Sequence, residues 1–100
     1  MFKEYDFSPG KVIFNNYDIE ESEVLDENNI NLTEDMLQVK FGKNLVLDVG
    51  WYSGIGRFIV YIINQCDWEH PVLRAEAKSY HDLKIALDNA MILLKEHYNK

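Results

Sequence analysis

The sequence has a single cysteine, Cys66, so no internal disulfide can form. A lone thiol fits a reducing compartment, and we expect the cytoplasm. Residues 1–11 contain no apolar run of the length found in a signal peptide, so no export by that route is expected. No stretch approaches the roughly 20 apolar residues that span a bilayer, so we expect no membrane partner.

Basic residues are also scarce. Asp and Glu number 17 and Lys and Arg 10, which gives a formal net charge of −7. Phosphate contacts require a basic surface, so direct binding of nucleic acid is not expected, and a basic protein is the favoured partner. The chain is 100 residues long and 47% hydrophobic, which predicts a single folded domain over residues 1–100.

The negative charge is concentrated in residues 18–35. No Lys or Arg lies between Lys11 and Lys40, and outside this segment the chain carries nine acids and ten bases. Asparagines favour turns here, while scattered aliphatic residues predict a short helix or an irregular segment packed on the core.

Such an acidic cluster is commonly just a solvated surface, but it can also match the basic cleft of another protein. Under the second interpretation Tyr17 or Ile19 would serve as an apolar anchor. The predicted partner-binding residues are Tyr17, Asp18, Ile19, Glu20, Glu21, Glu23, Asp26, Glu27, Glu34 and Asp35.

Residues 36–78 have the pattern of an antiparallel sheet. Apolar residues alternate over 37–41 and again over 45–52, which predicts two strands, the second of them central with one buried face. Residues 57–65 are apolar almost throughout, which is typical of a strand covered on both faces. Glycine-bearing turns at 42–44 and 53–56 separate these strands, and residues 72–78 predict an edge strand.

The two ends of the chain complete the predicted fold. Around Pro9 and Gly10, residues 1–16 predict a short strand, a turn and a second strand. Residues 79–98 predict a helix, because Ser79 can cap its start and an apolar stripe follows at helical spacing. The expected fold is α+β: an antiparallel sheet of about four to five strands with this long C-terminal helix on one face. The stripe consists of Leu83, Leu87, Ala90, Leu94 and Tyr98.

Residues that could carry chemistry are few. Cys66, His70 and His81 do not have the number or spacing of a zinc site, and no metal or cofactor is expected. A small enzyme or ligand-binding domain with a pocket near Asp48, Cys66 and His81 is an alternative, but no motif supports it, so we predict no catalytic residue.

Three large aromatic side chains allow two interpretations. They could anchor an interface, since aromatic residues are enriched at binding hot spots, or they could cover the ends of the core. Nothing in the sequence decides between these roles for Trp51, Tyr52 and Trp68.

Four stretches within residues 44–94 carry a family resemblance: LDVGWYSG, GRFIVYIINQ, the DWEHP turn and SYHDLKIALDNAMILL. In these the chain resembles small bacterial immunity proteins of contact-dependent growth inhibition and related polymorphic toxin systems. The resemblance implies a non-enzymatic cytoplasmic inhibitor that binds the C-terminal toxin domain of a cognate effector, often a nuclease with a basic cleft. It assigns no individual binding residue, and an export chaperone or adaptor with the same binding logic stays an alternative.

Overall fold

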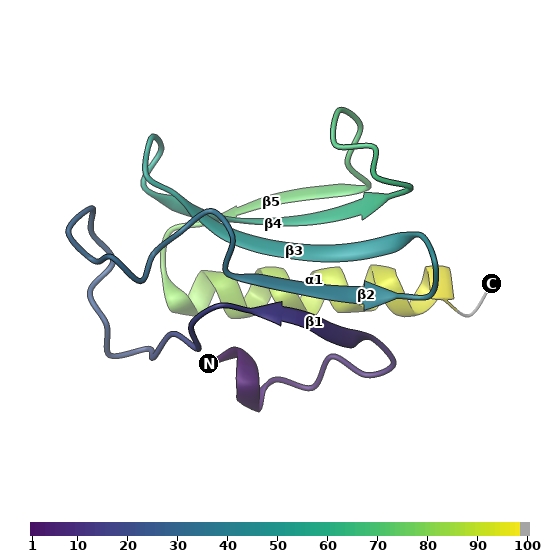
Figure 1. The fold of residues 1–100 in the computed structure, drawn as a ribbon, viewed down its shortest axis with the longest axis horizontal. Helices are drawn as coiled ribbons and strands as arrows, with labels where there is room; N and C mark the ends of the chain where they lie inside the picture. The colour runs from purple at the N-terminus through teal and green to yellow at the C-terminus, as the bar shows by residue number, and fades with distance from the viewer. Residues whose placement is uncertain (99–100) are drawn as a thin grey trace.

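A computed structural model of the protein describes residues 1–98, so residues 99 and 100 of the predicted domain lie outside the described part. The fold is a five-stranded antiparallel meander with strand order β1-β2-β3-β4-β5, followed by one helix that runs behind the sheet in Figure 1. This confirms the predicted α+β class. The elements are η1 (Phe2–Glu4), β1 (Lys11–Asn15), β2 (Leu37–Phe41), β3 (Leu45–Tyr52), β4 (Arg57–Asn64), β5 (Leu73–Ala77) and α1 (Tyr80–Tyr98).

Strand β3 is the central strand, as its alternating pattern predicted. Leu47, Val49 and Trp51 are buried in the core cluster that α1 also contributes to. The pattern understated the burial, however, because Asp48 and Gly50 on the opposite side of the strand are buried as well. Other parts of the chain therefore cover this second side.

Strand β4 is buried on both sides, as predicted. Phe58, Val60 and Ile62 belong to the main core cluster, whereas Ile59 and Ile63 point the other way and are 3% and 2% exposed. A strand with both sides covered favours β-branched and aromatic residues throughout, which explains the unbroken apolar run.

Helix α1 begins as the sequence predicted. The Ser79 hydroxyl accepts a hydrogen bond from the Asp82 amide at 3.0 Å, which satisfies one backbone donor of the first turn. The predicted stripe is buried from Leu83 to Leu94 and packs mainly on β4 and β5, while the side chain of Tyr98 lies outside the described residues. Within residues 1–98 no helix combines the length and apolarity needed to cross a bilayer.

The prediction of a strand before Pro9 is wrong. Residues 2–4 form a 3-10 turn, and no β-pairing is found for this segment. Phe2 and Phe7 are instead both buried in the core cluster, and Tyr5 stacks on Phe7 with ring centroids 4.7 Å apart. The apolar residues here close the core rather than extend the sheet.

The end of the acidic segment is fixed to the sheet at Gly50. The Trp51 amide donates to the Thr33 carbonyl at 2.7 Å, and the Met36 amide donates to the Val49 carbonyl at 3.1 Å. Between these two bonds the backbone of Glu34 passes so close to Gly50 that an added Cβ would lie 1.9 Å from the Glu34 carbonyl oxygen. Only glycine allows this approach.

The substitution Gly50→Ala should therefore destabilise the protein by about 1–3 kcal/mol, because backbone must move to admit the methyl group. The matched control is Gly54→Ala, whose Cβ would have no heavy atom within 4 Å, and we expect a change within about 0.5 kcal/mol. Urea unfolding followed by tryptophan fluorescence measures both. Equal stabilities of the two variants would contradict the close approach.

Candidate functional site

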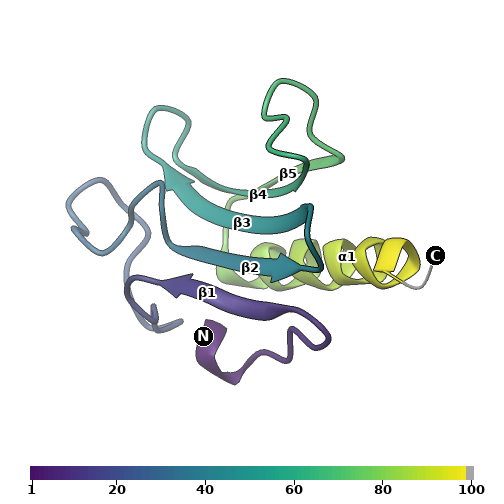
Figure 2. The same cartoon turned by 45° about the vertical axis from the view of Figure 1, so that its right-hand side comes forward.

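The acidic segment connects β1 to β2 without any helix or strand of its own. Short turns shape it, with the Glu23 amide donating to the Glu20 carbonyl and the Asn29 amide to the Asp26 carbonyl. It projects from the end of the sheet at which α1 begins, beside the hairpin between β3 and β4 (Figures 1 and 2). The sequence predicted either a short helix or an irregular segment here, and the structure shows the irregular segment.

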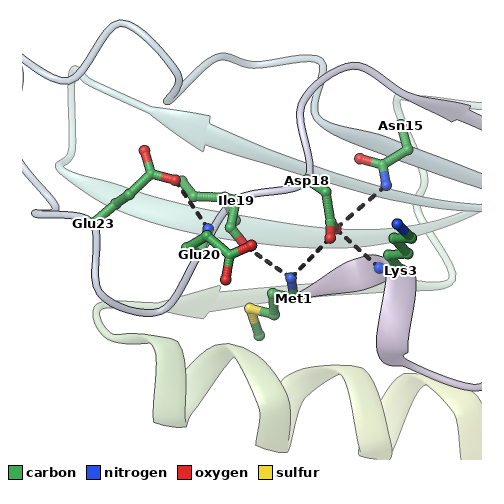
Figure 3. A network of polar contacts seen from close by, with 7 residues as sticks. All are labelled: Met1, Lys3, Asn15, Asp18, Ile19, Glu20 and Glu23. Atoms are coloured by element: carbon green, nitrogen blue, oxygen red, sulfur yellow. Dashed lines mark hydrogen bonds and ion pairs between the residues drawn. The ribbon is translucent and has the colours of Figure 1, made fainter.

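One acidic residue, Asp18, holds the segment to the N-terminus. Its carboxylate accepts hydrogen bonds from the Met1 amine at 3.2 Å and from the Lys3 amide at 2.9 Å, and the same amine donates to the Ile19 carbonyl (Figure 3). Burial by itself would raise the Asp18 pKa, but these bonds and one from Asn15 outweigh it and lower the pKa. Asp18 thus serves a structural role here.

A second acidic residue, Glu23, organises the tip of the segment. Its carboxylate accepts hydrogen bonds from the Glu20 amide and from the side-chain amide of Asn31, both at 2.9 Å. These bonds, the first of them most strongly, lower the Glu23 pKa. The Tyr80 hydroxyl also donates to the Glu23 carbonyl at 3.0 Å, which ties the segment to the start of α1.

Ile19 cannot contact a partner in this conformation, which corrects its assignment as an anchor. Its side chain is 0% exposed and belongs to the core cluster. The residue fixes the segment to the domain instead. The aliphatic residues of the segment predicted that it packs on the core, but without helical or strand spacing they did not single out Ile19 as the buried one.

Six acidic side chains remain on the surface. Within the described residues, none of them forms an ion pair with a Lys or Arg, and the single ion pair of the segment joins Asp18 to the N-terminal amine. The segment therefore presents carboxylates that the described part of the molecule does not neutralise. They are Glu20, Glu21, Asp26, Glu27, Glu34 and Asp35.

Apolar side chains stand exposed among these acids. Ile30 is 89% exposed, Val24 67% and Tyr17 41%. Tyr17 was predicted as an anchor from the sequence, whereas Val24 and Ile30 were assigned only to packing on the core. An isoleucine between asparagines, where turns keep it off the core, was the signal that could have identified Ile30.

The three large aromatic residues divide between the two roles. Trp51 is 5% exposed and packs edge-on against Phe58 in the core. Tyr52 and Trp68 lie on the opposite side of the sheet and both contact Tyr61 edge-to-face, at 6.3 Å and 5.6 Å between ring centroids. Trp51 is thus structural, and the other two belong to a surface aromatic cluster.

The fold does not assemble the alternative pocket of Asp48, Cys66 and His81. Cys66 follows the end of β4, whereas His81 follows Ala77, which pairs with the first residues of β4 at the opposite end of the sheet. Asp48 pairs with Tyr61 in the middle of the strand. Among residues 1–98 no group of three or more potential metal ligands comes together.

Asp48 is the one buried carboxylate in the sheet. Its residue is 3% exposed, and the Gln38 side-chain amide donates to its carboxylate at 2.8 Å. Burial raises the Asp48 pKa, the Gln38 hydrogen bond opposes this rise, and the nearby charge of Asp35 adds to it. Its ionisation therefore opposes folding.

We expect Asp48→Asn to increase stability at pH 7 by roughly 1 kcal/mol, because the amide keeps an acceptor for Gln38 without the buried charge. The raised pKa means that the penalty is complete above the folded-state pKa and disappears as the pH falls through the ordinary value of 3.8. Urea unfolding at a series of pH values tests this. An advantage of the variant that does not shrink toward pH 4 would contradict it.

No protein-family model matches this chain, and neither a curated protein nor a solved structure matches it. What the protein does has therefore to be inferred from its own surface.

Proposed function

We propose that this protein is an immunity protein. It binds the basic toxic domain of a cognate effector, of the nuclease class, in the bacterial cytoplasm and occludes that domain's nucleic-acid site. The observation that carries the proposal is the projecting acidic segment, residues 18–35. It presents exposed carboxylates without Lys or Arg partners in the described chain, together with the exposed Val24 and Ile30.

The two kinds of side chain would perform different tasks. Carboxylates attract a basic surface over distances up to the Debye length, about 8 Å at physiological ionic strength, and so raise the rate of encounter. Apolar side chains that become buried in the complex slow dissociation, because most affinity differences between related complexes lie in the off-rate. A stable interface of about 800 Å² per partner would occupy roughly an eighth of the 6234 Å² accessible surface.

The segment is suited to this role because contacts with the rest of the domain hold it in one conformation. Asp18, Glu23 and the backbone of Thr33 fix it to the N-terminus, the helix and β3, respectively. A segment that is already ordered loses less conformational entropy on binding than a flexible tail would. The exposed acids between these points then approach the partner in a set arrangement.

The first test neutralises three acids whose side chains make no hydrogen bond in the described structure, in the variant Glu20→Gln, Glu21→Gln and Glu27→Gln. The candidate partner is the C-terminal domain of the protein encoded immediately upstream, and its binding is measured by stopped-flow association over a range of salt concentrations. We expect association at low salt to slow by about tenfold and its salt dependence to weaken.

The control is matched in net charge and removes three exposed acids elsewhere, in the variant Asp67→Asn, Glu69→Gln and Glu96→Gln; of these, Asp67 contacts His70 at 3.3 Å. Equal rates for the two triple variants would show that the acidic segment is not the binding site. A partner that proves harmless to cells lacking this protein would exclude immunity and favour an export chaperone.

The second test concerns the apolar anchor. Ile30→Ser should leave the free energy of unfolding within about 0.5 kcal/mol of the original, because the side chain is already 89% exposed. It should nevertheless accelerate dissociation of the partner by tenfold or more, since a buried contact in the complex is lost. The control is Ile92→Ser on α1, an isoleucine that is 58% exposed. Equal dissociation rates for both variants would remove Ile30 from the interface.

A further inference from the structure

The side of the sheet that faces away from α1 carries polar and aromatic residues. Phe14, Gln38, Asp48, Tyr61 and Arg74 are paired in turn across the five strands and so form one row on this side. Within residues 1–98 the long helix α1 packs on the other side of the sheet, and no other helix covers this row, which lies on the side that faces the viewer in Figure 1. It is the open face of the sheet.

A hollow of about 340 Å³ lies on this open face, next to the hairpin between β3 and β4. The rings of Tyr52 and Tyr61 meet edge-to-face at 78°, and the buried Ile59 lies between them along the lining. The remaining lining comes from the hairpin, from Arg74 and from Glu34. Flat aromatic surfaces beside a carboxylate form a suitable site for a cationic side chain.

The electrostatics of the hollow favour a positive occupant. Burial, and then the charge of Asp48, raise the pKa of Tyr52 to about 12, and Glu34 and Asp35 add to the shift. The cation in the lining is Arg74, whose guanidinium forms an ion pair with Glu76 at 2.7 Å, and Glu76 also lies 3.8 Å from Arg57. Glu34 and Asp35 have no ion-pair partner among the described residues, so negative charge is left in excess there.

The hollow is continuous with the acidic segment. Glu34 belongs to both, and its backbone lies directly on β3 at Gly50. Ser53 lines the hollow and also a second one of about 330 Å³, where Asp26 and Glu27 face the same hairpin. A basic surface that docks on the segment therefore extends over the hairpin onto the open face.

We propose that the hollow lined by Tyr52 and Tyr61 receives an arginine side chain of the same basic partner, which stacks on the open face of one of the two rings. This inference rests on the proposed function and adds a second contact to it. A guanidinium plane can stack on a tyrosine ring and donate hydrogen bonds to Glu34 at the same time, which the compact ammonium of lysine does less well. The apolar floor and the planar walls thus select arginine over lysine.

The test uses two blocked nine-residue peptides of alternating glycine and basic residue, one with arginine and one with lysine. Each is titrated into the 15N-labelled protein at low salt and followed by two-dimensional NMR. We expect the arginine peptide to shift the amides of residues 52–61 and the Trp68 indole, and to bind at least threefold more tightly than the lysine peptide.

Three variants locate the contact. Tyr61→Leu should weaken binding of the arginine peptide about threefold or more, whereas Tyr61→Phe, which keeps the aromatic face, should retain it. Glu34→Gln should weaken it as well, while the matched control Glu96→Gln on α1 should not. Because Glu34 is exposed, Glu34→Gln should not disturb folding, so it still tests the site if Tyr61→Leu does not fold.

The outcomes separate this inference from the proposed function. Shifts confined to residues 17–33, equal affinity for the two peptides, or no shift with either peptide would each overturn the arginine site. None of these results bears on immunity, which the association experiment with the candidate partner domain decides independently.

Discussion

The packing of α1 against one side of the sheet is the contact on which the rest of the structure depends. Helix α1 packs mainly on β4 and β5 and buries Leu83, Leu87 and Leu94 in the core cluster, which Phe2 and Phe7 of the N-terminal residues also join. A chain of this size buries about two thirds of the surface that its unfolded form exposes, which is enough for one such core. The opposite side of the sheet is therefore covered only by loops and by neighbouring side chains.

Because α1 covers only one side of the sheet, the other side remains accessible as the open face. On the open face, Ile59 and Ile63 are covered by neighbouring side chains and loops rather than by a helix, and Tyr52, Tyr61 and Trp68 form the aromatic cluster there. At one end of the sheet the acidic segment lies beside the hairpin between β3 and β4. The side of the sheet that packs on α1 therefore supplies the stability of the fold, whereas the open face and the acidic segment are accessible to a partner.

The acidic segment shows that irregular structure need not be loose. Its carboxylates at Asp18 and Glu23 are used internally, to hold the N-terminal amine and to accept hydrogen bonds from backbone and asparagine amides. The acids that remain on the surface form no ion pair with a Lys or Arg within the described chain. A basic partner would supply the opposite charge, which is the physical reason for the function proposed above.

The sequence by itself determined the sheet, the helix and the order in which they follow, because their apolar spacing, turn glycines and the Ser79 cap are local signals. It also located the negative charge in residues 18–35. Only the tertiary structure decided that Ile19 is buried, that Ile30 is exposed, and that Phe2 and Phe7 close the core without forming a strand. These outcomes depend on which distant residues lie alongside, and no local spacing encodes that.

The hollow on the open face was likewise a product of the fold. Tyr52 and Tyr61 come together because β3 and β4 pair in one register, and Glu34 joins them because the backbone crosses Gly50. A shift of one residue in that register would put the two tyrosines on opposite sides of the sheet, since side chains alternate along a strand. The sequence specified the charges and the aromatic rings, and the pairing of the strands placed them around one site.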